Sequence, residues 1–282
     1  MMHLEAMTMQ IRSYIEHHSE ELTYDFQNII HYTTDFPTHT HSGWEFLYVI
    51  KGTLSYVVDG NFFDIGPGNL IISRPGAIHS LYTKGSIQYE RHDLIVVEHL
   101  LLPELLEQIP ADLHVLNISG NKNIAGLYEK FRYYLTKLQP AHINAIFPLL
   151  INELLTDILL ASQTHSQFVV SQSNAVITKV VNYIKEHVRE PLTVQSLCDS
   201  LFISPSYLHY CFTKYLNVTP KQYIMVQKLQ LAQQALVNAE NPTKVCREFG
   251  FHNYSTFYRN YQKIYGCRPS DSSQETLQKI VL

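Results

Sequence analysis

Two stretches near the carboxyl end decide the fold: residues 192–224, LTVQSLCDSLFISPSYLHYCFTKYLNVTPKQYI, and residues 241–270, NPTKVCREFGFHNYSTFYRNYQKIYGCRPS. They are two copies of one pattern, because Leu197-Cys198 recurs as Val245-Cys246 at an offset of 48 residues. The second copy then gains one residue, and at an offset of 49 the aligned positions are Leu208, Phe212, Lys214, Asn217 and Pro220 with Phe257, Tyr261, Lys263, Gly266 and Pro269. Such a repeat predicts a small helical unit that occurs twice in tandem, with a long helix over residues 224–236 between the copies.

Each copy is predicted to form a helix, a tight turn and a second helix. In the second copy Gly250 can adopt the positive φ that the turn needs, and Asn253 is a candidate N-cap. In the first copy Ser204-Pro205 combines an N-cap with a proline at the first helical position. Polar residues near a helix N-terminus, followed by basic residues, suit contacts to base edges and then to phosphates. The residues that we expect to contact DNA are Ser206, Tyr207, His209, Tyr210, Lys214, Asn253, Ser255, Tyr258, Arg259 and Lys263.

These two stretches resemble the C-terminal domain of the AraC/XylS transcription regulators, in which two helix-turn-helix units are joined by a linker helix. Gly250-Phe251, Arg259 and Gly266 lie at positions typical of that family. The resemblance implies that each second helix enters one of two successive major-groove segments on one face of the duplex. The departures from the family pattern are Cys198 and Cys246 in place of alanine, Phe202 in place of the first turn glycine, Tyr210 in place of a basic residue and Lys228 in place of an arginine.

The two halves of the chain differ in charge. Residues 1–172 contain 9 Lys and Arg against 18 Asp and Glu, whereas residues 173–282 contain 12 against 7. A polyanion therefore suits only the C-terminal part. The 4 cysteines form no C-x-x-C pair, which argues against a zinc knuckle and a disulfide framework. No apolar run reaches about 18 residues, so we expect a cytoplasmic protein without a membrane span.

The N-terminal part is predicted to be a β-barrel or sandwich followed by a helical hairpin. Short β-rich runs cover residues 45–50, 53–58, 61–65, 69–73, 79–83 and 87–97, with turn residues such as Asp59-Gly60 between them. Helical periodicity follows over residues 121–162. These helices can cover one face of the barrel, and a second apolar side would suit a homodimer contact. The resemblance to the AraC/XylS regulators implies that residues 1–32 form an arm over the barrel mouth, and the alternative is a frayed terminus.

A cluster of metal-ligand residue types lies in the predicted barrel. His39, His41, Glu45 and Gly52 fit H-x-H-x3-E-x6-G, and His79 follows a later turn. On an extended chain positions 39, 41 and 45 project to one face, where His79 from a neighbouring strand could join them. The spacing resembles the cupin motif, which implies His39, His41, Glu45 and His79 as ligands of a divalent transition metal. The alternative is a metal-free pocket for a small organic effector, with His39, His41, Trp44, Glu45, Arg74 and His79 as candidate contacts.

Together these patterns predict a multidomain α+β chain with a cupin-like sensor and dimerisation domain over residues 1–165. Its barrel spans about residues 24–118, and a linker over residues 166–174 leads to an all-α DNA-binding domain over residues 175–282. The predicted function is a transcription regulator, not an enzyme, controlled by an effector such as a sugar or related metabolite. Its expected partners are an operator duplex and, for an activator, RNA polymerase. The alternatives are a cupin metalloenzyme with an appended helical domain and a barrel that only dimerises.

Overall fold

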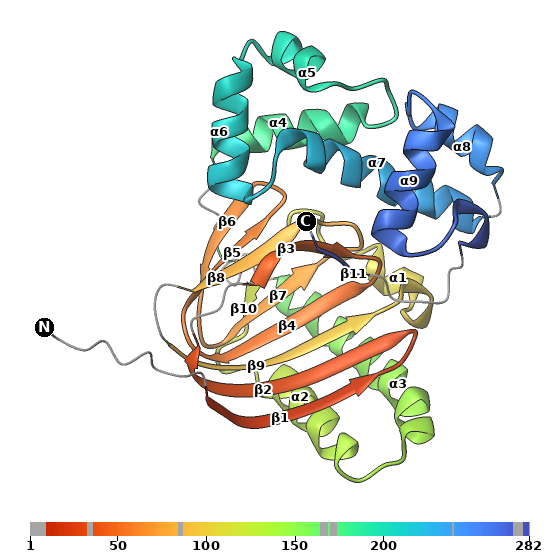
Figure 1. Ribbon diagram of the computed structural model, residues 1–282. Coiled ribbons are helices and arrows are strands. Elements are labelled where there is room, and N and C mark those ends of the chain that lie inside the picture. The colour runs from red at the N-terminus through yellow and green to blue at the C-terminus, as the bar shows by residue number, and fades with distance from the viewer. Residues whose placement is uncertain are drawn as a thin grey trace, which may run out of the picture.

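The computed structural model describes residues 10–32, 36–83, 87–163, 169, 174–238, 240–272 and 279–281. A barrel of two β-sheets carries a helical domain at one end and a pair of helices on the outer face of one sheet (Figure 1). This is the predicted α+β architecture. The predicted linker falls largely outside the described residues, apart from Val169, whose N–H donates to Val115 O at 3.1 Å, and Asn174, which caps the following helix.

The two sheets have interleaved strand orders. The larger sheet runs β1 (Gln10–His18), β2 (Leu22–Tyr32), β9 (Ile87–Val96), β4 (Trp44–Lys51), β7 (Asn69–Ser73) and β10 (Val115–Asn117). The smaller sheet runs β11 (Lys279–Val281), β3 (Phe36–His41), β8 (His79–Thr83), β5 (Leu54–Val58) and β6 (Asn61–Ile65). Strands β4 to β9 coincide with the predicted runs to within two residues.

The first described strands correct the expectation for the N-terminal residues. We expected an arm or a frayed terminus over residues 1–32, but β2 pairs with both β1 and β9 inside the larger sheet. Leu22, Tyr24 and Phe26 are buried on one face of β2. The alternate positions Thr23 and Asp25 are polar, so this stretch has the alternation of a half-buried strand, a signal that the sequence prediction did not use. Residues 1–9 lie outside the described part of the chain.

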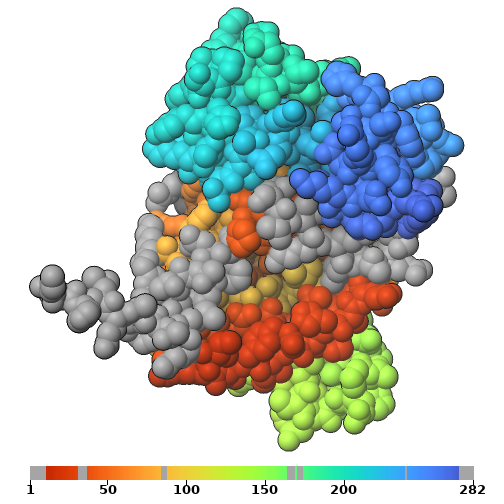
Figure 2. Space-filling model, in the orientation of Figure 1, coloured from red at the N-terminus to blue at the C-terminus, as the bar shows by residue number. Residues whose placement is uncertain are grey.

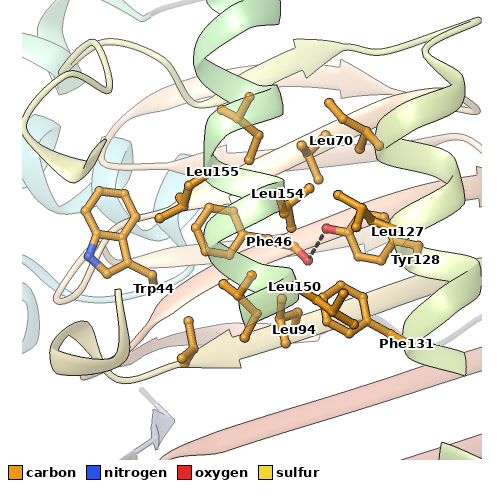
Figure 3. Packing of buried hydrophobic residues seen from close by; sticks show 14 of the residues in the cluster. Trp44, Phe46, Leu70, Leu94, Leu127, Tyr128, Phe131, Leu150, Leu154 and Leu155 are labelled. Atoms are coloured by element: carbon orange, nitrogen blue, oxygen red, sulfur yellow. Dashed lines mark hydrogen bonds between the residues drawn. The ribbon is translucent and has the colours of Figure 1, made fainter. Parts of the chain in front are cut away.

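Alternation along β4 separates two cores. Leu47 and Val49 point between the sheets, where they join residues of β5, β6 and β8 in one buried cluster. Trp44 and Phe46 point the other way, towards α2 (Lys122–Leu135) and α3 (Pro140–Ser162). Figure 3 shows this second core, in which Tyr128 Oη donates to Phe46 O at 3.0 Å. The helical pair therefore covers the outer face of the larger sheet, as the pattern predicted.

Helix α3 is long and apolar enough to cross a membrane by length and composition, with a mean hydropathy of 1.6 over its best window. We expected no such segment, because polar residues interrupt its apolar runs. Ile151, Leu154 and Ile158 are fully buried against the barrel core, although only 33% of that window is buried. Leu149 and Leu160 on the same helix are exposed.

The C-terminal domain is helical from α4 to η3. Its helices are α4 (Ala175–His187), α5 (Val194–Leu201), α6 (Pro205–Leu216), α7 (Pro220–Val237), α8 (Pro242–Glu248) and α9 (Tyr254–Tyr265), followed by the short η3 (Pro269–Asp271). One apolar cluster joins α4 to α7 with Val57 and Ile78 of the barrel, and another joins α7 to α9. All four cysteines are free thiols in these helices and the turn that follows them.

Candidate functional site

The two helix-turn-helix units have the same backbone conformation at equivalent positions of the repeat. Phe202 and Gly250, which are 48 positions apart, both adopt left-handed backbone, with φ of 57° and 64°. Asn217 and Gly266, which are 49 positions apart, both end their helices in the same conformation, with φ of 54° and 70°. The aligned side chains of the second helices are buried together, because Leu208, Phe212, Phe257 and Tyr261 are all 0% exposed. The internal repeat of the sequence is therefore a structural repeat.

The second helix of each unit begins at the predicted cap. Ser204 Oγ accepts from the N–H of Tyr207 at 3.2 Å at the start of α6, and Pro205 occupies the first turn. Asn253 Oδ1 accepts from the N–H of Thr256 at 2.7 Å at the start of α9. These bonds satisfy free amides of the first turn and fix where each helix starts. Asn253 is therefore the N-cap of α9, as predicted, and it is also one of the residues expected to contact DNA.

The predicted DNA-contacting residues lie on the solvent side of α6 and α9. Figure 2 shows both units at the molecular surface, the first in cyan and the second in blue. Tyr258 is half-buried. The exposed members of the set are Ser206, Tyr207, His209, Tyr210, Lys214, Asn253, Ser255, Arg259 and Lys263.

The two exposed faces differ in chemistry. On α6 the Lys214 ammonium donates to Tyr210 Oη at 2.9 Å and lies 5.2 Å from the ring centre of Tyr215. Phe202, in the turn before α6, is 94% exposed. On α9 Arg259 and Lys263 are both exposed one turn apart. The first unit therefore presents an aromatic surface with one cation, and the second presents a more basic one.

Lys228 joins the two units and was not assigned a role from the sequence. It lies on α7, is only 4% exposed, and donates through Nζ to Glu190 O at 2.7 Å and to Gly250 O at 3.1 Å. Burial lowers the pKa of this ammonium. The two carbonyls belong to the segment before α5 and to the turn of the second unit, so Lys228 fixes one unit against the other through backbone groups. Nothing in a single sequence signals such a bridge to carbonyls.

Replacing Phe202 by glycine should stabilise the protein by about 0.5 to 1 kcal/mol, because glycine adopts left-handed backbone without the cost that an L side chain incurs. Little is lost with the Phe202 side chain, since it is almost fully exposed. Phe202→Ala is the matched control and should change stability by less than the glycine variant. Urea denaturation followed by circular dichroism measures both, and an equal or greater gain for alanine would contradict the backbone explanation.

The sensor candidate is a compact buried cluster between the sheets. His39 and His41 come from β3, Glu45 from β4 and His79 from β8, and one ligand-type atom from each lies within 4.8 Å of the others. Each of the four residues is at most 4% exposed. The Oε2 atom of Glu45 lies 3.2 Å from His79 Nε2 and 3.5 Å from His41 Nε2. The strand alternation thus brings together the set that the spacing predicted.

Hydrogen bonds around the cluster orient its imidazoles. The Nδ1 atoms of His39, His41 and His79 lie 2.8, 2.8 and 2.9 Å from the backbone carbonyls of Pro37, Gly43 and Ala77. A carbonyl accepts only, so each Nδ1 carries the proton and each Nε2 of a neutral ring is left with a lone pair. Within the described part of the chain, the buried Nε2 atoms of His41 and His79 make no hydrogen bond of acceptable geometry.

The carboxylate of the cluster is held in its ionised form. Burial alone would raise the pKa of Glu45, but the positive charges of His79 and His41 in their protonated forms outweigh it and hold that pKa well below its usual value. Ser73 Oγ donates to Glu45 Oε2 at 2.6 Å and lies 2.9 Å from Tyr56 Oη. Three imidazole nitrogens and one supported carboxylate form a donor set that suits divalent transition metals.

Two residues grouped with this cluster in the sequence lie elsewhere. Trp44 is on the opposite face of β4 from Glu45, packed in the core under α3, and its Nε1 donates to Glu98 Oε2 at 3.2 Å (Figure 3). Arg74 lies over the Trp44 ring at 5.4 Å and donates to Leu113 O at 3.1 Å. The physical reason is strand parity, since neighbouring residues on a strand face opposite sides. Neither side chain belongs to the cluster between the sheets.

Arg91, on β9, lies between the sheets. It is 3% exposed, and its guanidinium lies 2.8 Å from Asp25 Oδ1 and 3.1 Å from Asp93 Oδ2. Asp93 is paired in register with Leu47, which faces the same core. The interior therefore holds a second polar group beside the histidine cluster. The parity of Tyr89, Arg91 and Asp93 on β9 is the sequence signal that could have found it.

The barrel hairpin of β5 and β6 docks into the helical domain. At its tip the Asp59 carboxylate accepts from Lys185 Nζ at 2.7 Å and from Tyr223 Oη at 3.2 Å. A Cβ atom on Gly60 would lie 2.7 Å from a methyl of Ile177, so only glycine fits there. Two clefts of about 260 and 730 Å³ lie along α7 where it faces the barrel, and both are lined by Pro75 and Gln234.

Comparison with protein families matches both halves of the chain. Residues 197–275 match a helix-turn-helix domain, and residues 28–89 match a cupin domain. A cupin domain followed by a helix-turn-helix domain is the pair of domains expected from the resemblance to the AraC/XylS regulators. The helix-turn-helix match runs from within α5 to beyond α9, and the cupin match includes His39, His41, Glu45 and His79.

Proteins similar to this chain are named as transcription regulators. The XylDLEGF operon transcriptional activator of Pseudomonas putida is 27% identical over 119 residues, which cover 41% of this chain and 37% of the relative. The match thus spans little more than a third of that relative's length. The HTH-type transcriptional regulator YobQ of Bacillus subtilis (strain 168) is 23% identical over 84% of this chain and 89% of its own. Among solved structures, the AraC-like transcriptional activator CuxR overlaps 79% of this chain and 80% of its own at 14% identity and a TM-score of 0.39.

Proposed function

We propose that this chain is a DNA-binding transcription regulator in which the tandem helix-turn-helix units read an operator. One observation carries the proposal: the repeat buries the aligned apolar residues of α6 and α9 completely and leaves their polar and basic residues at the surface. The positive balance of residues 173–282 supports it, since phosphate contacts supply most of the affinity of such domains. The names of the relatives point the same way.

The test begins with a randomised duplex library, because the operator sequence is unknown. The full chain should retain a subset of duplexes, and its affinity for them should fall steeply with salt as counterions are released. Failure to enrich any sequence, or an affinity that does not depend on salt, would reject the proposal. Binding is measured by fluorescence anisotropy on the selected duplex.

The barrel interior is proposed to hold the effector that controls DNA binding. Beside the Glu45 cluster, Arg91 offers hydrogen-bond donors, and Asp25 and Asp93 offer acceptors. Such a mixture suits the hydroxyl groups of a sugar or related metabolite, which both donate and accept. Such an effector can act only if it favours one placement of the DNA-binding units over another. RNA polymerase is a further partner if the protein activates, and the exposed apolar residues of α3 are proposed to support a homodimer.

The effector proposal predicts a thermal shift with members of a panel of sugars and small acids. A ligand at 100 times its Kd adds about 2.7 kcal/mol to stability. Glu45→Gln should remove the shift if the ligand lies between the sheets, whereas Gln234→Ala should leave it intact. If Gln234→Ala removed the shift and Glu45→Gln did not, the effector site would lie in the clefts along α7.

A divalent metal in the His39, His41, Glu45 and His79 cluster is a second candidate, supported by the unbonded Nε2 atoms and the oriented rings. A bound metal would supply a positive charge and a Lewis-acid centre between the sheets. His41→Ala combined with Glu45→Ala should abolish the metal content measured by elemental analysis. Arg74→Ala, outside the cluster, should retain it. Absence of metal from the wild-type protein purified without chelator would exclude this candidate.

A further inference from the structure

Strand β3 carries the sensor cluster on one of its faces. His39 and His41 point between the sheets, where their rings lie 4.3 and 5.0 Å from the ring of His79. Thr38 and Thr40 occupy the alternate positions and therefore point away from the cluster. A change in the position of the two histidines must consequently move groups on the opposite face of the same strand.

The opposite face of β3 contacts the helical domain directly. Thr38 Oγ1 donates to Leu216 O, at the end of α6, at 2.8 Å. Gln230 Nε2, on α7, donates to Thr40 Oγ1. Both threonines are buried, at 2% and 0% exposure. The strand is thus bonded to the second helix of the first unit and to the helix that joins the units.

The free edge of β3 is covered by the end of the chain. After the second unit and η3, the chain returns as β11, which pairs antiparallel with β3. The register places Lys279 opposite His41, Ile280 opposite Thr40 and Val281 opposite His39. In Figure 1 β11 lies along β3 below α7. Since β8 occupies the other edge, β11 provides the outermost ladder of this sheet.

We propose that β11 is a detachable strap that couples the second helix-turn-helix unit to the sensor strand β3. The inference rests on the proposed function and adds a route of regulation to it. The strap is three residues long and lies at a sheet edge, so it is held by few ladder hydrogen bonds and opens more easily than a central strand. Its partner residues include two of the four members of the sensor cluster.

Thermodynamic linkage gives the strap a measurable consequence. A ligand of the cluster that fixes His39 and His41 also fixes β3 in the register that β11 recognises. Pairing of β11 must then strengthen that ligand's binding by the same factor by which the ligand strengthens the pairing. Pairing of β11 also holds the chain that follows the second unit against β3. The first unit is connected independently through Thr38 and Thr40.

Hydrogen exchange of the full chain tests the pairing without any ligand or DNA. Deleting residues 279–282 should raise the exchange rate of the β3 amides that face β11 at least tenfold and leave β4 unchanged. Ile280→Val, a conservative change within the strand, is the matched control and should exchange like the wild type. An unchanged rate at residues 39–41 after the deletion would overturn the proposal. Circular dichroism verifies that the shortened chain is folded.

The coupling itself is tested with Zn²⁺ as the probe. The deletion should weaken zinc binding at least fivefold, and zinc should slow exchange at the end of α9 in the full chain but not in the shortened one. Equal zinc affinity of the two chains, or no zinc binding by the full chain, would overturn the coupling. DNA affinity is measured separately on the selected duplex. If the chain gives the expected exchange and zinc results but binds no DNA, the proposed function is contradicted and the proposal for β11 is not.

Discussion

Gly250→Ala is expected to lower the free energy of unfolding by about 2 to 4 kcal/mol. Gly250 has a φ of +64°, where an L side chain is strained by about 1 to 2 kcal/mol. An added Cβ would also lie 2.5 Å from Glu190 O and 2.9 Å from Lys228 Nζ. The backbone at Glu190 cannot move away without breaking the bond that Lys228 donates to it. The substitution therefore strains the backbone of the turn and also breaks the Lys228 bridge between the two units.

A second glycine provides the control with the opposite sign. Gly126 lies in helix α2 with no atom within 4 Å of an added Cβ, so Gly126→Ala should stabilise the protein by about 0.5 to 1 kcal/mol. Urea denaturation followed by helical circular dichroism measures both variants. If Gly250→Ala proved as stable as the wild type, the turn of the second unit would not have the close contacts described above.

Arg259→Ala is expected to weaken binding to the selected duplex by about 10- to 100-fold, the equivalent of losing one good arginine contact. Arg259 is exposed on α9, and its Nε donates only to Ser255 O within the helix at 3.3 Å among the hydrogen bonds of the described chain. The guanidinium therefore stays available for DNA. Loss of a base contact would also relax the sequence preference at one position.

Two lysine variants, Lys263→Ala and Lys130→Ala, distinguish a lost contact of α9 with DNA from a general loss of positive charge as the cause of weaker DNA binding. Lys263 lies one turn further along α9 and should act on phosphate, so its removal should lower the salt slope by about 1 without changing sequence preference. Lys130 is a lysine of similar exposure on α2, paired with Glu153, and its removal should leave DNA affinity unchanged. Equal losses from Lys130→Ala and Arg259→Ala would mean that binding depends on overall charge and not on α9.

Much of the fold could be predicted because local patterns and tertiary packing agree. Strands β4 to β9 are short runs rich in β-branched and aromatic residues between clear turn residues, and Asp59-Gly60 forms the expected hairpin tip. The caps at Ser204 and Asn253 locate α6 and α9. The prediction identified no strand at β1 or β2, although its barrel limits of about residues 24–118 include most of β2, where Asp25 pairs with Arg91.

The candidate sites were predictable where spacing along one element determines geometry. Parity on β3 and β4 brought His39, His41 and Glu45 together, and the repeat identified the exposed face of each second helix. The same parity excludes Trp44, which had been grouped with the effector residues because of its chemistry. Contacts between distant segments left no trace in the pattern. Lys228 bonds to two carbonyls, and β11 pairs with β3 across more than two hundred residues of chain.

Hydroxyl-radical footprinting of the full chain on its selected duplex tests the central proposal most directly. Two second helices that enter successive major-groove segments should protect two stretches of backbone one helical turn, about 10 base pairs, apart on the same face. Arg259→Ala should lose the stretch bound by α9 and keep that bound by α6. A single protected stretch, or two on opposite faces of the duplex, would contradict the assignment of the tandem units as one DNA-reading surface.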